Sequence, residues 1–247
     1  MTSTVLTNHR IAGNGGTAPH PMNRTDLRLV GGSGNALVEL ALSPSVGGQT
    51  SRLEANEAAL DPQDAAGKVV FVREGLLRVY HSLGEGKRRL VGLVSAGHFA
   101  GLEALAGAEE SSTTMIAAEP STVVIVDAAK LLQLALTDPA AGRELTQELA
   151  RRATQVEAQL TEATLLDCET QLLHVLVRLG RAAGQDGNGW VTLRLTQQDL
   201  ADALGIARET VNGMLQRLGS QQLIAKGRGR INFDVTQLAQ WASHAKN

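Results

Sequence analysis

The first half of the chain shows the short-period alternation of apolar and polar residues that is typical of β-strands. The stretch KVVFVREGLLRVYHSLGEGKRRLVGLVSAG, residues 68–97, alternates around Gly75, turns at LGEGK and runs back. The stretch TTMIAAEPSTVVIVDAAKLLQLA, residues 113–135, predicts two more strands separated by EPS, and then a helix. Many short strands at regular spacing predict an all-β roll or barrel over residues 27–136.

From Asp138 the apolar residues follow a helical period in DPAAGRELTQELARRATQVEAQLTEATLLD. The apolar stripe is narrow, as in a coiled-coil seam, and Arg152 interrupts it. We therefore predict a dimerisation helix over 137–166; the alternative is a surface helix packed on its own domain. The residues expected in the dimer interface are Leu145, Leu149, Val156, Leu160 and Ala163.

The last third of the chain predicts a compact mixed domain. A second helix, ETQLLHVLVRLGRAAG, precedes the glycine-rich loop GQDGNGW and the short strand VTLRL. At the other end, GSQQLIAKGRGRINFDVTQLAQWA predicts a turn, a strand, a Gly/Arg-rich hairpin tip, a strand and a final helix.

Between them lies TQQDLADALGIARETVNGMLQRL, residues 196–218, which has the pattern of a helix-turn-helix. Thr196 and Asp199 form a variant of the capping box, and Gly205 suits the turn. The second helix, 207–218, is the expected recognition helix, although Ala207 is a poor N-cap. The apolar positions that we expect to be buried are Leu200, Ala201, Leu204, Ile206, Val211, Met214 and Leu215.

With those positions buried, Arg208, Glu209 and Asn212 point outward as candidate base readers. Arginine can donate two bonds to guanine, and glutamate can accept one from cytosine. The alternative is a solvated Arg208–Glu209 pair on a surface helix. Residues of a type suited to bind phosphate are Gln197, Thr210, Lys226, Arg228 and Arg230.

Composition narrows the class of protein. The 247 residues carry a net charge of −2 and 43% hydrophobic residues, which is typical of a soluble globular protein. No apolar run approaches the roughly 20 residues of a membrane span. The single cysteine, Cys168, fits a reducing cytosol, and we expect it to be buried and inert. Residues 186–247 carry seven Lys/Arg against five Asp/Glu, which permits a nucleic-acid contact there.

The segments REGLLRVY, GHFAGLEAL and LTQQDLADALGIARETVNGMLQRLGSQQLI resemble the CRP/FNR superfamily of bacterial transcription regulators, from about residue 27 to 247. The resemblance implies an α+β fold with a cyclic-nucleotide-binding-like jelly roll (the β-roll), the dimerisation helix and a winged helix-turn-helix. The expected boundaries are a disordered tail over 1–26, the β-roll over 27–136, the helix over 137–166 and the DNA-binding domain over 167–247, with a hinge at Asp167.

The resemblance also assigns function. Arg208, Glu209 and Thr210 match the residues that begin the recognition helix in the cyclic-AMP receptor branch, where the first two read a TGTGA-like half-site. Gly213 stands where the family commonly has a second base-reading arginine, so one base is read less strictly or differently. The resemblance implies a cytoplasmic homodimer that binds double-stranded DNA and activates transcription by contacting RNA polymerase.

The segments that would hold cyclic AMP depart from the family pattern. The carboxylate is displaced by one residue in Gly101-Leu102-Glu103, which in a strand-like segment sends it to the opposite face. Ser112-Thr113 lacks the arginine that would bind the cyclic phosphate, and Val156-Glu157 replaces a Thr-Ser pair on the long helix. These departures argue against cyclic AMP, and we expect no cofactor and no metal. The alternatives are a regulator gated by a nucleotide or another ligand in the β-roll, and heme on His81, His98 or His174.

No nucleophile–base pair, phosphate loop or metal-ligand spacing appears in a signature context, which argues against an enzyme. A protein-interaction module is disfavoured by the outward Arg208-Glu209 pair.

Overall fold

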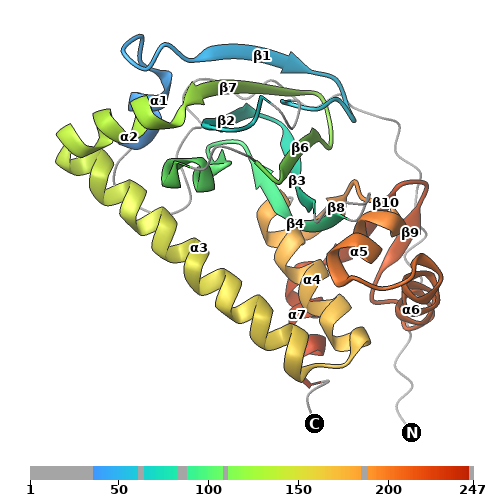
Figure 1. The fold of residues 1–247 in the computed structure, drawn as a ribbon. Helices are drawn as coiled ribbons and strands as arrows, with labels where there is room; N and C mark the ends of the chain where they lie inside the picture. The colour runs from blue at the N-terminus through green and yellow to red at the C-terminus, as the bar shows by residue number, and fades with distance from the viewer. Residues whose placement is uncertain (1–35, 61–63, 83–87, 108–110, 185–188, 245–247) are drawn as a thin grey trace, which may run out of the picture. The chain divides into compact units, whose positions relative to one another are not determined.

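The computed structural model describes residues 36–60, 64–82, 88–107, 111–184 and 189–244 (Figure 1). The tail predicted over 1–26, the start of the β-roll and the LGEGK turn lie outside the described residues, as does most of the GQDGNGW loop.

The predicted β-roll is confirmed. Its antiparallel strands form two sheets, ordered β1-β7-β2-β5 and β4-β3-β6 (Figure 1). Apolar residues such as Val70, Val72, Leu77, Val79 and Met115 fill the core between the sheets. The strands are β1 (Gln49–Leu53), β2 (Lys68–Glu74), β3 (Leu76–Ser82), β4 (Arg88–Ser95), β5 (Phe99–Ala100), β6 (Thr113–Ala117) and β7 (Ser121–Asp127).

Strand β3 does not follow the predicted alternation of buried and exposed residues, because both of its faces are covered. Leu77 and Val79 belong to the core of the β-roll, whereas Leu76 and Tyr80 belong to the core shared with the C-terminal elements. Arg78, on the same face as Tyr80, is buried too. A polar position in a strand therefore marked an interdomain contact instead of a solvent-facing side chain.

The segment before β1 is helical, which the prediction of strands from residue 27 onward missed. Helix α1 (Ala36–Leu42) buries Leu37, Val38 and Ala41. The carboxylate of Glu144 accepts hydrogen bonds from the backbone N–H groups of Ala36 and Leu37, at 3.4 and 2.9 Å. Because this cap comes from 107 residues away, no local pattern announced it.

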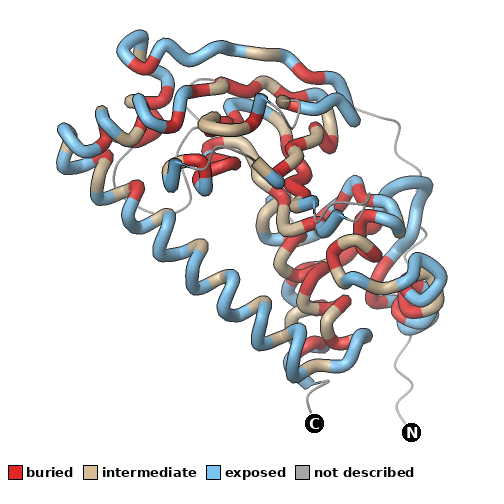
Figure 2. The backbone as a smooth tube through the Cα atoms, viewed as in Figure 1, coloured by how far each residue is buried: buried red, intermediate tan, exposed pale blue. Residues whose placement is uncertain are grey.

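Two helices follow the β-roll. Helix α2 (Ala128–Thr137) is capped by Asp127, and helix α3 (Pro139–Leu165) by Asp138. Pro139 lies in the first turn of α3, as predicted, and the helix is within two residues of the expected 137–166. Figure 2 shows exposed and half-buried residues along most of α3, whereas α4 carries a long run of buried ones.

The C-terminal elements form the predicted winged helix-turn-helix. Leu172, Leu176, Val211, Phe233 and Leu238 are among its fully buried core residues. Cys168, the first residue of α4, is exposed instead of buried, because helix α4 turns its apolar face away from it. The elements are α4 (Cys168–Ala183), β8 (Trp190–Leu193), α5 (Gln197–Leu204), α6 (Arg208–Ser220), β9 (Ala225–Gly227), β10 (Arg230–Asp234) and α7 (Val235–His244).

Helix α6 contains Gly213, at which an added Cβ would meet only the Arg217 guanidinium, at 4.0 Å. Replacing Gly213 by Ala should stabilise the fold by about 1 kcal/mol, because glycine in a helix interior costs that much in backbone entropy. We expect a melting temperature about 2–4 °C higher by circular dichroism. Gly205→Ala is the control: its φ of 71° disfavours alanine although its surroundings are open, so it should lower the melting temperature. Two variants shifting in the same direction would contradict this account.

The Asp167 carboxylate accepts bonds from the backbone N–H groups of Glu169 and Thr170 and from the Thr170 hydroxyl. The Thr170 bonds, followed by the bond from Glu169, hold the pKa of this carboxyl below its usual value. The unfolded pKa of about 3.9 is therefore the higher one, so this stabilisation is complete above about pH 5. It is lost as the pH falls through the folded pKa.

Asp167→Asn keeps an acceptor oxygen but does not titrate. We expect the difference in unfolding free energy between wild type and variant to shrink between about pH 5 and pH 2. Urea unfolding at each pH measures it. A difference that stays constant over this range would be inconsistent with the cap.

Candidate DNA-reading surface and effector cavity

The first helix of the motif begins with the predicted capping box. The Thr196 hydroxyl accepts a hydrogen bond from the Asp199 backbone N–H at 3.1 Å, and the Asp199 carboxylate accepts one from the Thr196 N–H at 2.7 Å. At its other end Gly205 adopts the left-handed conformation, with φ 71°. Both predictions about this helix are confirmed.

The recognition helix presents the predicted charged residues to solvent. Val211, Met214 and Leu215 are buried, so Arg208, Glu209 and Thr210 lie exposed in the first turn of α6. Ala207 gives no side-chain cap, which leaves first-turn N–H groups without that partner. Within the described ranges, no hydrogen bond or ion pair engages the side chains of Arg208 and Glu209, so both are available to a ligand.

Two further predicted residues contact each other. The Gln197 side-chain amide donates to the Asn212 side-chain carbonyl at 2.9 Å, and both residues are half-buried. The sequence assigned Gln197 to phosphate and Asn212 to bases, 15 positions apart. Their pairing means that Asn212 is held against the first helix, and contact with a base requires it to share or break this bond.

The wing carries its cations on an exposed hairpin. Strands β9 and β10 pair antiparallel, with Arg230 opposite Gly227, and Lys226, Arg228 and Arg230 are all exposed. These side chains are accessible to an anionic ligand.

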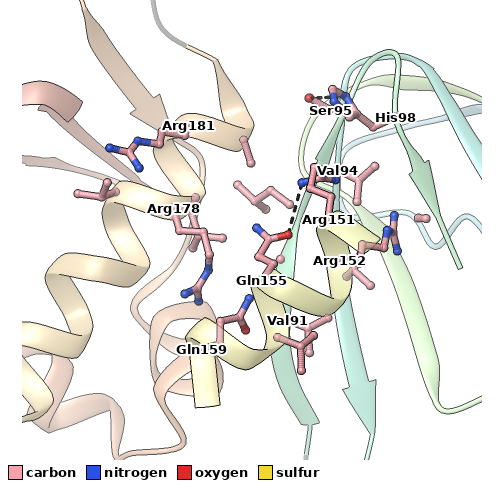
Figure 3. A pocket seen from close by; sticks show the side chains of 18 of the residues that line it. Val91, Val94, Ser95, His98, Arg151, Arg152, Gln155, Gln159, Arg178 and Arg181 are labelled. Atoms are coloured by element: carbon pink, nitrogen blue, oxygen red, sulfur yellow. Dashed lines mark hydrogen bonds between the residues drawn. The ribbon is translucent and has the colours of Figure 1, made fainter. Parts of the chain in front are cut away.

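A cavity of about 1030 Å³ lies between β4, the segment around Gly101, α3, α4 and α7 (Figure 3). Of the residues predicted for a degenerate effector site, Gly101, Glu103 and Val156 line it. Leu102 is buried in the protein core, Glu157 is exposed, and neither Ser112 nor Thr113 lines the cavity. The structure thus brings only part of the predicted set together.

The expectation of a strand-like segment at Gly101-Leu102-Glu103, in which the displaced carboxylate would lie on the opposite face, was wrong. Gly101 has φ 76° and begins a 3-10 helix, η1 (Leu102–Ala106), so the two-residue period of a strand does not apply. Leu102 enters the core instead, and the Glu103 carboxylate accepts a hydrogen bond from the Thr113 hydroxyl. That hydroxyl is therefore already engaged inside the protein.

Arg152 is a cavity residue that was not predicted. It donates from α3 to the Phe99 carbonyl and, at 3.0 Å, to Glu148. Arg151 also binds Glu148, at 2.8 Å. Burial would raise the pKa of the Glu148 carboxyl, but bonds from both arginines outweigh it and lower the pKa. The signal in the sequence was an arginine interrupting an apolar stripe.

The far wall of the cavity belongs to α4. His174 lies with Nδ1 2.8 Å from Glu162 of α3, and Arg178 donates to the same carboxylate at 3.3 Å. Burial, together with the charge of Arg89, lowers the pKa of the Arg178 guanidinium despite that carboxylate. Gln155 and Gln159 approach the same space from α3 (Figure 3). His81 and His98 line the cavity as well.

Helix α3 turns an apolar stripe away from the rest of the chain. Val156 and Leu160 are 63% and 66% exposed, and Leu149 and Ala163 are also exposed. Leu145 is buried within its own chain, where α1 and α2 pack on the start of α3, so its prediction as an interface residue was wrong. Leu165, the last residue of α3, is exposed too, but it lies on a different side of the helix from this stripe.

Among the described residues, no group of three or more His, Cys, Asp or Glu side chains is placed to hold a metal ion. In the same ranges, no helix combines the length and apolar character that crossing a membrane requires.

Comparison with known proteins assigns both the β-roll and the C-terminal helix-turn-helix to known domain families. Residues 50–138 match the family described as cyclic nucleotide-binding domain, and residues 170–241 match the Crp-like helix-turn-helix domain. Neither description names a catalytic activity.

Relatives that match over most of their length are transcriptional regulators as well. The probable transcriptional regulator flp of Lacticaseibacillus casei is 32% identical over 166 residues, 66% of this chain and 73% of that protein. The transcriptional regulator SdrP of Thermus thermophilus is 31% identical over 182 residues, 70% and 80% of the two chains. The solved structure of FixK2 from Bradyrhizobium japonicum superposes with a TM-score of 0.66 at 21% identity, covering 78% and 96%, and supports the fold. The chain belongs to the CRP/FNR superfamily of transcriptional regulators and is a DNA-binding regulator of that type.

Proposed function

We propose that the protein is a homodimeric activator that reads a two-fold-symmetric, TGTGA-like site without cyclic AMP. The observation that carries the proposal is the exposed pair Arg208 and Glu209 in the first turn of α6, free of partners among the described residues. The alternative is that Arg208 and Glu209 form a solvated surface pair without a role in binding. It does not account for the capping box, the Gly205 turn and the cationic wing around the pair.

The chemistry of the surface supports the site. The Arg208 guanidinium can donate two bonds to guanine O6 and N7, and Glu209 can accept from cytosine N4. Thr210, Gln197 and the wing cations Lys226, Arg228 and Arg230 can bind phosphates on either side. Gly213 offers no side chain to the next base, so one position of each half-site is read loosely.

The exposed stripe on α3 supports the dimer. Val156 and Leu160 leave large apolar side chains in water, and a second copy of the helix would cover them. A two-fold dimer places its two recognition helices about 34 Å apart, one turn of DNA, which accounts for a palindromic site. Activation through contact with RNA polymerase rests on family membership alone.

Independence from cyclic AMP follows from the chemistry of the cavity. Its β-roll side offers the Glu103 carboxylate, which already accepts a hydrogen bond from Thr113, in place of an arginine for the phosphate. On α3, Val156-Glu157 replaces the Thr-Ser pair that would meet the base; Val156 lines the cavity without a hydrogen-bonding group, and Glu157 is exposed.

A second candidate function is gating by another small ligand. The cavity of about 1030 Å³ exceeds the volume that most small effectors need, and Arg152, Gln155 and Gln159 offer it polar groups from α3. Heme on one of the three histidines that line the cavity, His81, His98 or His174, is a variant of this candidate.

Arg208→Ala should weaken binding to a palindromic TGTGA-type duplex by at least about 10- to 100-fold, because each of the two half-sites loses a bidentate contact that contributes about 1–3 kcal/mol. Fluorescence anisotropy at fixed salt, against a scrambled duplex, measures this. Arg143→Ala removes an exposed arginine from α3 and should leave affinity unchanged. Cyclic AMP should change none of these values. Binding only with the nucleotide would favour the gated candidate, and equal affinity for both duplexes would refute sequence-specific reading.

Leu160→Lys should convert the protein to a monomer, because a charge in the helix seam opposes its own copy. Sedimentation equilibrium gives the mass, and affinity for the palindrome should fall along with it. Thr161→Lys adds the same charge at the exposed neighbouring position outside the stripe and should leave the dimer intact. A dimer that survives Leu160→Lys would place the interface elsewhere.

A further inference from the structure

A buried polar cluster joins the β-roll to the helix-turn-helix. The Tyr80 hydroxyl donates to one oxygen of Asp199 at 2.6 Å, and Arg78 donates to the other at 3.2 Å. Arg78 is 7%, Tyr80 1% and Asp199 3% exposed. The acceptor is the same carboxylate that completes the capping box of α5, so one side chain belongs to both structures.

Arg78 is fastened on the side of the β-roll as well. Its second terminal nitrogen donates to the Asn56 side-chain carbonyl at 2.6 Å and to the Ala117 backbone carbonyl at 3.3 Å. These bonds hold the guanidinium on the β-roll, and its other terminal nitrogen, Nη1, donates to Asp199 of α5. The guanidinium therefore acts as a rigid support, not as a flexible surface cation.

The charge states match this arrangement. Burial, with the neighbouring Asp199 carboxylate, raises the pKa of the Tyr80 phenol above its usual value, so it stays protonated and donates. Burial alone would raise the pKa of Asp199, but bonds from Tyr80 and Thr196 and the charge of Arg78 outweigh it. Asp199 is consequently ionised, and pulling α5 away would strand a charge on each side.

A second contact one turn further along α5 has the same polarity. Arg88 of β4 donates to Asp202 at 2.9 Å and lies over the Tyr80 ring, 4.4 Å from its centre. Asp199 and Asp202 are three residues apart and share a helix face. That acidic face of α5 meets a cationic face of the β-roll, and apolar residues Leu76, Leu90 and Leu93 pack around it.

We infer that Arg78 and Tyr80 are positioning residues for DNA binding. Through Asp199 they fix α5, and with it α6, relative to the β-roll. The inference rests on the proposed function, because its consequence is the separation of two recognition helices in a dimer. In this docked arrangement Arg208, Glu209 and Thr210 are exposed, so docking presents the base readers instead of covering them. Loosening the contact between α5 and the β-roll should weaken the preference of the dimer for one spacing between the two half-sites.

The test uses the full chain and a series of palindromic duplexes whose half-sites are moved apart or together by one or two base pairs. A duplex with a single half-site is included. Wild type should bind one spacing at least 10-fold more tightly than its neighbours. Tyr80→Phe and Arg78→Gln should weaken that spacing about 10-fold and flatten the profile, while half-site binding stays unchanged. Arg78→Lys, which keeps the charge, should recover part of the preference.

Arg73→Gln is the matched control, since it removes an exposed arginine of β2 and should keep the wild-type profile. Arg88→Gln weakens the same contact from its half-exposed rim, so it decides the question if a buried variant does not fold. Unchanged profiles in Tyr80→Phe, Arg78→Gln and Arg88→Gln would overturn this inference and leave the proposed function standing. Tighter binding in these variants would overturn it too, because the docked state would then be a resting state. A wild type that binds no palindrome would instead refute the proposed function.

Discussion

The carboxylate of Asp199 is the interaction on which the arrangement of the DNA-binding domain depends. It caps the first helix of the motif and, at the same time, receives Tyr80 and Arg78 from the β-roll. A buried carboxylate is tolerated only with such complete pairing, because each unpaired charge in the interior is costly. The consequence is that the local start of a helix and the docking of a whole domain share one side chain. The reading helix α6 follows this helix directly.

Charged side chains are paired within the protein in the cavity as well. Arg151 and Arg152 share Glu148, and Arg178 binds Glu162, which His174 also contacts. These three arginines, which could attract an anionic ligand, therefore already have internal carboxylate partners. Glu103, the carboxylate of the β-roll side, is occupied by Thr113. The cavity has the volume of an effector site, while these arginines and carboxylates of its lining are paired with other groups of the protein. This pairing is one of the observations that support the proposal of a regulator that works without cyclic AMP.

Helix α3 separates two environments along its length. Its polar face, with Arg152, Gln155 and Gln159, lines the cavity. Its apolar stripe is largely exposed at Leu160 and at Val156, which also borders the cavity. Any ligand in the cavity would contact the same helix that carries the proposed dimer seam. The docking of α5 on the β-roll then fixes the position of α6 relative to that seam. The cavity, the proposed dimer seam and α6 are thus linked through helices α3 and α5 and through the buried Arg78–Asp199 ion pair.

The sequence by itself determined the elements whose signals are local: the capping box at Thr196 and Asp199, the Gly205 turn, the Asp138–Pro139 start of α3 and the exposed Arg208-Glu209 pair. Periodicity and capping depend on residues a few positions apart, so they are visible in one stretch of chain. Only the tertiary structure decided the rest. The cap of α1 comes from Glu144, the turn at Gly101 redirects Glu103 toward Thr113, and Leu145 is buried under helices that precede it. Arg78 meets Asp199 across 121 positions of sequence. Each of these depends on chain segments that become neighbours only on folding, and no local pattern carries that information.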